Sequence, residues 1–286
     1  MMNQNNDETV AEKTAEQLHA WGVRYVFGTI GDSIGPLVSA MKSGDGPYFV
    51  SLQSAKTTGL CASAYAKITG ELGVCFADAG PAAAYLINGA YDAYYDSVPL
   101  LALSGQSPQH LRGTSYQQTT EPNLTFAGCT SFSATGSDPV GSLHLLRKAM
   151  RTAHANNTSA HLALPRDVQM YSCPEPVRQP PYGAELQRHK KPQMDPQLVH
   201  QMAEEMAASD RPVIVFGQSA RNFAPQLWRF ASALPAPMVC TLPAVGVFPS
   251  DEPLLMGVVG DAGTPPPPDP FRGRYSSDCW DQLVAG

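Results

Sequence analysis

Two short turns place a glycine directly after apolar segments that are typical of buried strands. Gly31 lies in the segment Gly28–Asp32, and Gly80 precedes Pro81. Glycine permits a tight turn and also lets a ligand approach the backbone closely, so either role explains both positions. Open α/β sheets bind ligands at the carboxyl ends of their strands. We therefore treat Gly31 and Gly80 as candidate ligand contacts, with simple tight turns as the alternative.

A third turn, in the second half of the chain, has the context of a nucleotide phosphate site. Gly217, Ser219 and Arg221 follow a strand-like segment and open a predicted helix. The amide groups at a helix N-terminus bind phosphate, so this placement suits a nucleotide. The six cysteines show none of the spacings typical of a metal site, and we expect no metal ligands.

Strands and helices must alternate to position these turns. Apolar residues recur at helical spacing from Val10 to Trp21. Strands are expected at 25–27, 48–52, 73–77, 98–104, 129–134 and 160–164, with helices near 34–41, 54–69, 81–93 and 138–155 between them. This alternation predicts an α/β fold with a doubly wound, mostly parallel sheet and helices on both faces.

Changes of composition divide the chain into four parts. Residues 1–171 form the first predicted domain, and the proline-rich residues 172–195 are expected to be a linker. Residues 196–263 begin a second, Rossmann-like series with strands at 211–217 and 238–242, after which we expect the alternation to stop. Four consecutive prolines exclude a helix where they occur in the aperiodic tail 264–286. The second domain is therefore expected to be partial.

The overall composition excludes several functional classes. The net charge is −6 without a basic run, which argues against nucleic acid as a partner. No apolar stretch has the length of a transmembrane helix, and the polar N-terminus lacks the features of a signal peptide. Scattered cysteines favour free buried thiols. We therefore expect a cytoplasmic protein without a membrane span.

From residue 9 to about 262, the chain resembles thiamine-diphosphate-dependent enzymes of the pyruvate oxidase and acetolactate synthase type. Six segments carry the resemblance by their order and spacing, namely residues 15–37, 62–81, 86–106, 160–169, 211–221 and 253–263. The segments Gly31–Ile34 and Tyr116–Gln118 lean toward pyruvate oxidase and quinone-linked pyruvate dehydrogenase. The match covers the N-terminal pyrimidine-binding domain and about half of the central domain.

The resemblance implies thiamine diphosphate as cofactor and identifies the residue on which its chemistry depends. In the family, a glutamic acid donates to ring N1′, and the 4′-amino group can then take the proton from the thiazolium C2. The family segment R-H-E-E corresponds to Gln53–Lys56 here, so Ala55 occupies the position of the acid. Losing a positioned acid costs about 10²–10⁴ in rate. We therefore assign no catalytic residue.

The resemblance also implies where the cofactor and substrate would touch the chain. Cofactor contacts fall on Gly31, Ala55, Gly80, Pro81 and Tyr85. The family turn G-P-G is Gly80–Ala82 here, and Tyr85 stands where a polar side chain is expected. Tyr116 and Gln117 match a pair that faces the substrate in the oxidase branch, although a satisfied loop amide is the favoured interpretation of Gln117.

The resemblance also implies ligands for the second domain and for a missing third domain. Gly217, Ser219, Arg221 and Thr241 would be the vestige of an FAD site, with bound FAD the less favoured outcome. Mg²⁺ would bind only through a third domain, which finds no match in this sequence.

Three functional hypotheses remain open. The favoured one is a truncated or degenerate member of the family, related to the decarboxylation of 2-oxo acids such as pyruvate but inactive alone. The second is a non-catalytic, oligomerising or regulatory binding protein, because the small-residue face of helix 54–69 would need a partner. The third is one subunit of a split enzyme, whose partner chain supplies the diphosphate-binding domain.

Overall fold

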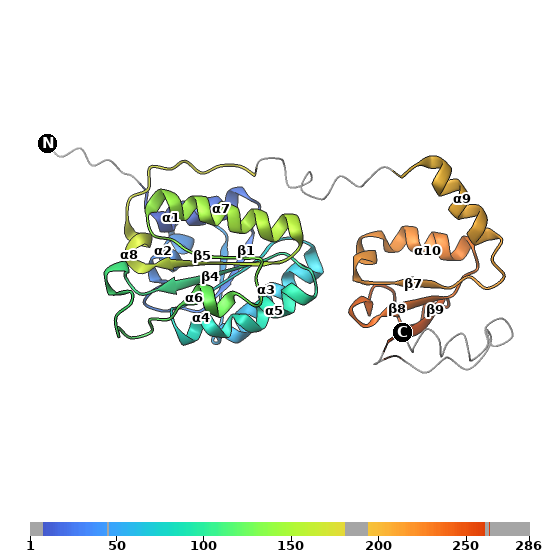
Figure 1. Ribbon diagram of the computed structural model, residues 1–286, viewed down its shortest axis with the longest axis horizontal. Coiled ribbons are helices and arrows are strands. Elements are labelled where there is room, and N and C mark those ends of the chain that lie inside the picture. Colours follow the sequence, from blue (N-terminus) through green and yellow to red (C-terminus); the bar gives the residue numbers. More distant parts are fainter. Residues whose placement is uncertain (1–7, 45, 181–193, 261–262, 264–286) are drawn as a thin grey trace. The chain divides into compact units, whose positions relative to one another are not determined.

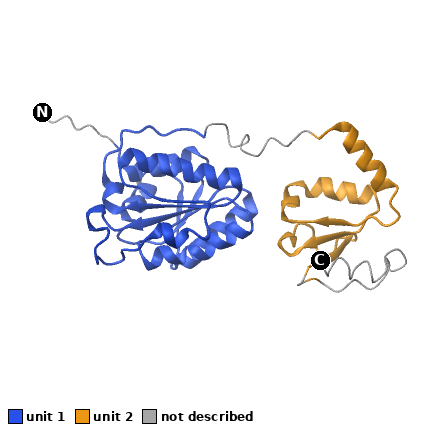
Figure 2. Cartoon of the chain, in the orientation of Figure 1, with its two compact units in different colours: residues 1–191 blue, residues 192–286 orange. Residues whose placement is uncertain are grey.

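The computed structural model describes residues 8–44, 46–180, 194–260 and 263. The chain divides into two compact units, Met1–Lys191 and Pro192–Gly286, which we describe separately (Figure 2). Within the described ranges, no helix is long and apolar enough to cross a membrane.

The first unit is built on a six-stranded sheet whose strand pairs are all parallel (Figure 1). The strand order is β2-β1-β3-β4-β6-β5. The strands are β1 (Tyr25–Gly28), β2 (Tyr48–Ser51), β3 (Gly73–Ala77), β4 (Leu100–Gln106), β5 (Phe132–Thr135) and β6 (Ser159–Pro165). Every residue of β3, β4 and β6 is buried, as expected for central strands covered on both faces. The predicted doubly wound α/β fold is confirmed.

Helices cover both faces of this sheet and enclose two apolar cores. One face carries α1 (Val10–Ala20), α2 (Gly35–Ser43), α7 (Pro139–Asn156) and α8 (Arg166–Met170). The other carries α3 (Ala55–Thr69), α4 (Pro81–Tyr85), α5 (Ile87–Tyr95) and α6 (Pro122–Phe126). The short 3₁₀ helix η1 (Gln109–Leu111) follows β4.

Local sequence explains where two long helices begin. The hydroxyl of Thr9 accepts from the Glu12 amide, and the Glu12 carboxylate accepts from the Thr9 amide, which forms a capping box at the start of α1. Asp138 caps α7 by accepting from the Gly141 amide at 2.7 Å.

The small-residue face of α3 is occupied by the chain itself. A Cβ added to Gly89 in α5 would overlap the backbone of Gly59 in α3, so these two helices meet at backbone contact. Ala62 and Ala66 of α3 are also buried. The expectation that this face is uncovered and awaits a partner is therefore wrong, because α5 and the sheet cover it.

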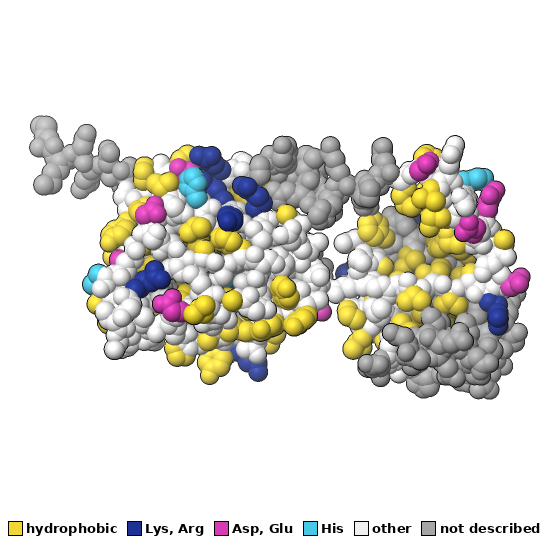
Figure 3. All heavy atoms as spheres, viewed as in Figure 1, with side chains coloured by type: hydrophobic (Ala, Val, Ile, Leu, Met, Phe, Trp, Pro, Cys, Tyr) yellow, Lys and Arg dark blue, Asp and Glu magenta, His cyan; other side chains and the backbone are white. Residues whose placement is uncertain are grey.

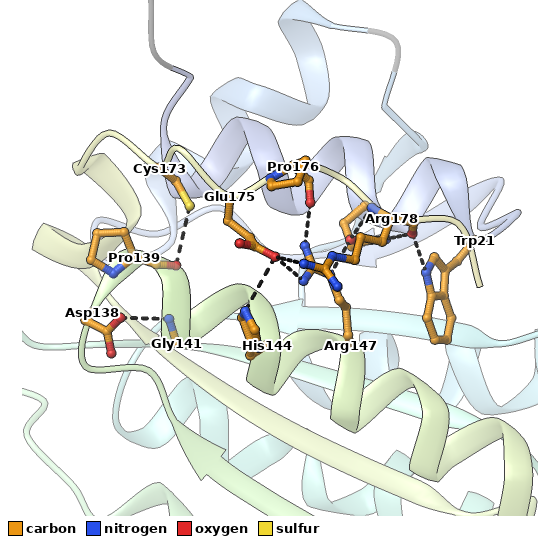
Figure 4. A network of polar contacts seen from close by, with 11 residues as sticks. Trp21, Asp138, Pro139, Gly141, His144, Arg147, Cys173, Glu175, Pro176 and Arg178 are labelled. Atoms are coloured by element: carbon orange, nitrogen blue, oxygen red, sulfur yellow. Dashed lines mark hydrogen bonds and ion pairs between the residues drawn. The ribbon is translucent and has the colours of Figure 1, made fainter. Parts of the chain in front are cut away.

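Residues 172–180, the first described part of the predicted linker, run across α1 and α7 (Figure 4). The buried guanidinium of Arg147 in α7 holds this segment. Its Nε donates to Gln17 Oε1 at 2.8 Å, its Nη1 to Glu175 Oε1 at 2.8 Å, and its Nη2 to the carbonyl oxygen of Pro176 at 2.6 Å. The hydrogen bond from Arg147 lowers the pKa of Glu175.

Two side chains hold the same segment at Arg178: one belongs to α1, and the other belongs to the residue directly after α1. Gln17 Nε2 and Trp21 Nε1 donate to the carbonyl oxygen of Arg178 at 2.6 and 3.0 Å. The predicted linker continues into residues 181–193, which lie outside the described residues.

The second unit contains a parallel sheet of three strands in the order β7-β8-β9. Its strands are β7 (Ile214–Phe216), β8 (Met238–Thr241) and β9 (Leu255–Val259), and its helices are α9 (Pro196–Ala207), η2 (Gln218–Phe223), α10 (Ala224–Ala233) and η3 (Leu242–Ala244). The expectation that the alternation stops after 238–242 is wrong, because β9 adds a third strand. The predicted tail 264–286 lies outside the described residues.

Candidate functional site

The carboxyl edge of the first sheet has a topological switch point between β1 and β3. The chain passes from β1 to β2 on one side, whereas β3 pairs with β4 on the other. The loops 29–34 and 78–81 therefore diverge here, at the place where sheets of this class bind ligands. Both glycine turns that the sequence singled out belong to these loops.

Asp78, which directly follows β3, anchors the loop after β1. The amide and the hydroxyl of Ser33 donate to Asp78 Oδ1, the amide at 2.8 Å, and the Ala79 amide donates to Ser33 Oγ at 2.9 Å. A Cβ on Gly31 would collide with the side chain of Asp78. This close packing accounts for the glycine without a ligand, and a cofactor contact at Gly31 stays a prediction.

The pair of Ser33 and Asp78 was not predicted. The sequence did carry one signal, because Asp78 stands directly after a strand whose five residues are all buried. Gln169 of α8 supports the same loop. Its Nε2 donates to the carbonyl oxygens of Ser33 and Leu164 at 2.7 and 2.8 Å. The loop is thus fixed both by Asp78 at the end of β3 and by Gln169 of α8.

Ala55 is the first residue of α3 and is only 5% exposed. It belongs to the apolar cluster beneath α3 and α5, which also contains Ala77, and the partly buried Phe27 and Ala82 pack against that cluster. Lys56, the next residue, is exposed. The position that the resemblance gives to the family's acid therefore lies at the sheet edge in apolar surroundings.

The turn after β3 requires glycine for two reasons. Gly80 has a φ of 67°, in the left-handed region, and a Cβ there would lie 2.9 Å from the carbonyl oxygen of Gln118. Pro81 begins α4, where its missing amide proton costs nothing, and Tyr85, which ends α4, is 57% exposed. The predicted helix 81–93 is two helices, α4 and α5, with a break at Leu86.

The contact of Gly80 with Gln118 brings the loop that carries Tyr116 and Gln117 beside this turn. Both side chains are exposed. Gln106 at the end of β4 holds the end of the loop, since its Nε2 donates to the carbonyl oxygen of Thr120 at 2.8 Å. The structure thus places the predicted substrate-facing loop next to the Gly80–Pro81 turn, and substrate contact by either residue stays a prediction.

Thr29 is a further polar residue at this edge that was not predicted. Its hydroxyl oxygen is buried and has no hydrogen-bond partner among the described residues. A threonine at the end of a strand is common, so its type and position gave no signal. The part of the chain that the structure describes contains no group of three His, Cys, Asp or Glu side chains that could hold a metal ion.

In the second unit, the structure brings together two of the predicted nucleotide contacts. Gly217 follows β7 and Thr241 ends β8, and a Cβ on Gly217 would lie 3.7 Å from Thr241 Oγ1. Ser219 and Arg221 lie in η2, whose six residues form a 3₁₀ helix instead of the predicted start of an α-helix. Arg221 Nε is buried without a hydrogen-bond partner among the described residues.

Comparison with known protein families gives two matches along the chain. Residues 8–126 match the model "Thiamine pyrophosphate enzyme, N-terminal TPP binding domain". Residues 199–268 match the model "Thiamine pyrophosphate enzyme, central domain". The first match contains every candidate residue of the first unit, and the second contains all four candidate residues of the second unit.

Several proteins are similar to most of this chain. A putative thiamine pyrophosphate-containing protein, YdaP, of Bacillus subtilis is 33% identical over 91% of the chain. A pyruvate oxidase of Lactiplantibacillus plantarum is 30% identical over 84%, and a probable acetolactate synthase large subunit of Methanocaldococcus jannaschii is 31% identical over 89%. The chain spans 45%, 40% and 44% of these three relatives, respectively.

Proposed function

The chain belongs to the thiamine pyrophosphate enzyme family, and we propose that its first unit is a pyrimidine-binding domain that does not activate thiamine diphosphate through a carboxylic acid. The observation that carries this proposal is Ala55, a buried methyl group among apolar neighbours at the position of the family's acid. An alanine can neither donate a proton to a ring nitrogen nor accept one back.

The acids that follow β1 and β3 do not replace the missing group. Asp78 is occupied by the amide and hydroxyl of Ser33. Asp32 is largely exposed and pairs with Arg166 at 2.9 Å. We infer that the pyrimidine ring would bind at this edge of the sheet without being protonated there.

In this family, thiamine diphosphate supplies the nucleophilic carbon that attacks a 2-oxo acid. Gly31, Gly80, Pro81 and Tyr85 would line the ring in this chain, and Tyr116 and Gln117 would face the substrate. Because Ala55 removes the activating step, we propose a degenerate family member that is related to the decarboxylation of pyruvate-like acids but is inactive by itself. An FAD site at Gly217 and its neighbours would be a vestige.

Two binding measurements test this proposal. Saturation-transfer NMR with millimolar thiamine should show transfer to the protons of the pyrimidine ring. Calorimetry with thiamine diphosphate and Mg²⁺ should show no micromolar binding by wild type or by Ala55→Glu, because the described residues offer no metal cluster. Absence of transfer to the ring, or micromolar binding by the wild-type chain, would contradict the proposal.

A second candidate function, a binding protein that acts through self-association, is favoured by the surface of α4 and α5. Four tyrosines of these helices are between 39% and 76% exposed, namely Tyr85, Tyr91, Tyr94 and Tyr95. Hydrophobic side chains gather over the same helices in Figure 3. Such a patch favours a partner, either a second copy or a chain that supplies a diphosphate-binding domain. In light scattering after size exclusion, a micromolar monomer would argue against self-association.

A further inference from the structure

The hydroxyl group of Thr29 is the polar atom at the switch point that the fold leaves unexplained. Its oxygen is buried and has no hydrogen-bond partner within the described part of the chain. Buried hydroxyl groups are almost always hydrogen-bonded, because an unpaired one loses its interaction with water and gains nothing in return. A residue that retains such a group at the ligand-binding edge of a sheet invites a functional explanation.

The backbone shows which face of the sheet the Thr29 side chain occupies. The Thr29 amide donates to the carbonyl oxygen of Phe76 at 3.3 Å, which continues the ladder between β1 and β3 by one residue. Side chains alternate along a strand, so Thr29 lies on the same face as Phe27. Phe27 packs against the cluster that contains Ala55, whereas Val26 belongs to the core on the opposite face.

Thr29 and Ala55 also share one edge of the sheet. The Leu52 amide donates to the carbonyl oxygen of Gly28 at 2.8 Å and joins the ends of β1 and β2. Ala55 follows three residues after Leu52, at the start of α3. Both residues therefore stand at neighbouring strand ends, on the α3 face.

We propose that the Thr29 hydroxyl is the group that hydrogen-bonds the pyrimidine ring in this chain, at the sheet edge where Ala55 has no polar atom. This inference rests on the proposed function, because it concerns the same site. A hydroxyl can donate to a ring nitrogen or accept from an exocyclic amino group. It does not transfer its proton at neutral pH, so this hydroxyl would recognise a neutral aminopyrimidine and leave it unprotonated.

The chain contains a matched control for this proposal. Thr14 in α1 also has a buried hydroxyl without a hydrogen-bond partner among the described residues, but it lies in a helix that packs on the opposite face. Thr14→Val and Thr29→Val each remove one unpaired buried hydroxyl and keep the shape of the side chain. Both variants should therefore fold and resist urea at least as well as the wild type.

The test is an NMR titration of the full chain with thiamine, followed on the ring protons by saturation transfer. Loss of one neutral hydrogen bond should weaken binding by Thr29→Val about 5-fold. Thr29→Ser, which keeps the hydroxyl, should bind within about 2-fold of wild type, and Thr14→Val should bind like wild type.

Each outcome decides something different. Equal affinity of wild type and Thr29→Val would overturn this inference and leave the proposed function standing. An equal loss in Thr14→Val would also overturn it, because the effect would then be structural. If the wild-type chain gives no transfer to the ring, the proposed function fails and this inference fails with it.

Discussion

His161 illustrates how much a single buried side chain can determine at the scale of one residue. It lies fully buried in β6, and its ring nitrogens are 2.9 Å from Ser104 Oγ and 2.9 Å from Ser133 Oγ. Phe126 of α6 stacks on the ring with a centroid distance of 3.9 Å. Burial lowers the pKa of His161 to about 3, so the imidazole is neutral in the folded protein.

The low pKa of His161 predicts that the first unit loses stability in acid. The unfolded chain binds a proton on this histidine below about pH 6.5, whereas the folded chain binds it only near pH 3. Stability contributed by the neutral ring is therefore complete above pH 6.5 and falls by about 1.4 kcal/mol per pH unit as the pH drops toward 3. Urea unfolding at pH 7.5, 6.0 and 5.0 measures this slope.

His161→Gln isolates the contribution of this side chain, because glutamine can still bond to both serines but does not titrate. The difference between the two unfolding free energies should change with pH by the stated slope. His154, whose pKa burial also lowers, stays in both proteins and cancels in the comparison. A difference that is constant from pH 7.5 to 5.0 would show that His161 does not titrate as expected.

At the same scale, the sequence identified some site residues and missed others. Gly80 and Pro81 could be found because a glycine and a proline after an apolar run indicate a turn. Ser33 and Asp78 are 45 positions apart, and their hydrogen bond exists only once β1 and β3 pair. Thr29 was missed because its unpaired hydroxyl is a property of its surroundings.

Among the elements, the packing of α3 on α5 depends on the absence of two side chains. Because a Cβ on Gly89 would overlap the backbone of Gly59, Gly89→Ala must push the two helices apart. We expect a loss of about 1–3 kcal/mol in the free energy of unfolding, in spite of the better helix propensity of alanine. Chemical denaturation measures the loss.

Gly35 provides the control for this substitution. It begins α2, and a Cβ there would meet nothing within 4 Å. Gly35→Ala should be neutral or should stabilise the chain by up to about 1 kcal/mol. If both variants lose the same stability, helix packing at Gly89 is not the cause.

The segment 172–180 depends in the same way on Arg147 of α7. The side chains of Arg147 and Glu175 are only 7% and 13% exposed, and Arg147→Met would leave Glu175 and Gln17 without their main donor. Glu175 keeps its ion pair with Arg178 at 3.1 Å, so we expect a loss of about 1–3 kcal/mol from the missing hydrogen bonds. Amide exchange at Cys173 and Arg178 should accelerate, because the loosened segment would break the hydrogen bonds from these amides to the Glu8 carbonyl oxygen and to Gln17 Oε1.

Arg151→Met changes an exposed arginine one turn further along α7 and should alter stability by no more than about 0.5 kcal/mol. If amide exchange at Cys173 and Arg178 is equally fast in wild type and Arg147→Met, the guanidinium does not hold the segment.

Prediction of the elements succeeded where the apolar pattern was uniform. The runs at 73–77 and 160–164 became fully buried strands. β9 was missed because Gly257, with a φ of 135°, interrupts it, and the register with β8 shifts between Met238 and Val239. The break at Leu86 was missed because no glycine or proline marks it; the Leu86 amide donates to the carbonyl oxygen of Ala83, which tightens the turn.

For the whole molecule, the two units differ in how completely they bury their apolar residues. The first has cores on both faces of its sheet. The second has one smaller core around Phe216 and Met238, and α9 contains no buried residue among those described. Stability of the first unit should therefore not depend on the second.

Residues 8–180 should fold alone, since they contain the whole six-stranded sheet and the segment that Arg147 holds. Their urea unfolding should be cooperative, with a free energy within about 1 kcal/mol of the corresponding transition in the full chain. The fragment should also retain saturation transfer to the pyrimidine ring of thiamine. A fragment that unfolds without cooperativity would mean that the second unit contributes to the first. Loss of ring contact in a folded fragment would mean that residues outside 8–180 contribute to ring binding.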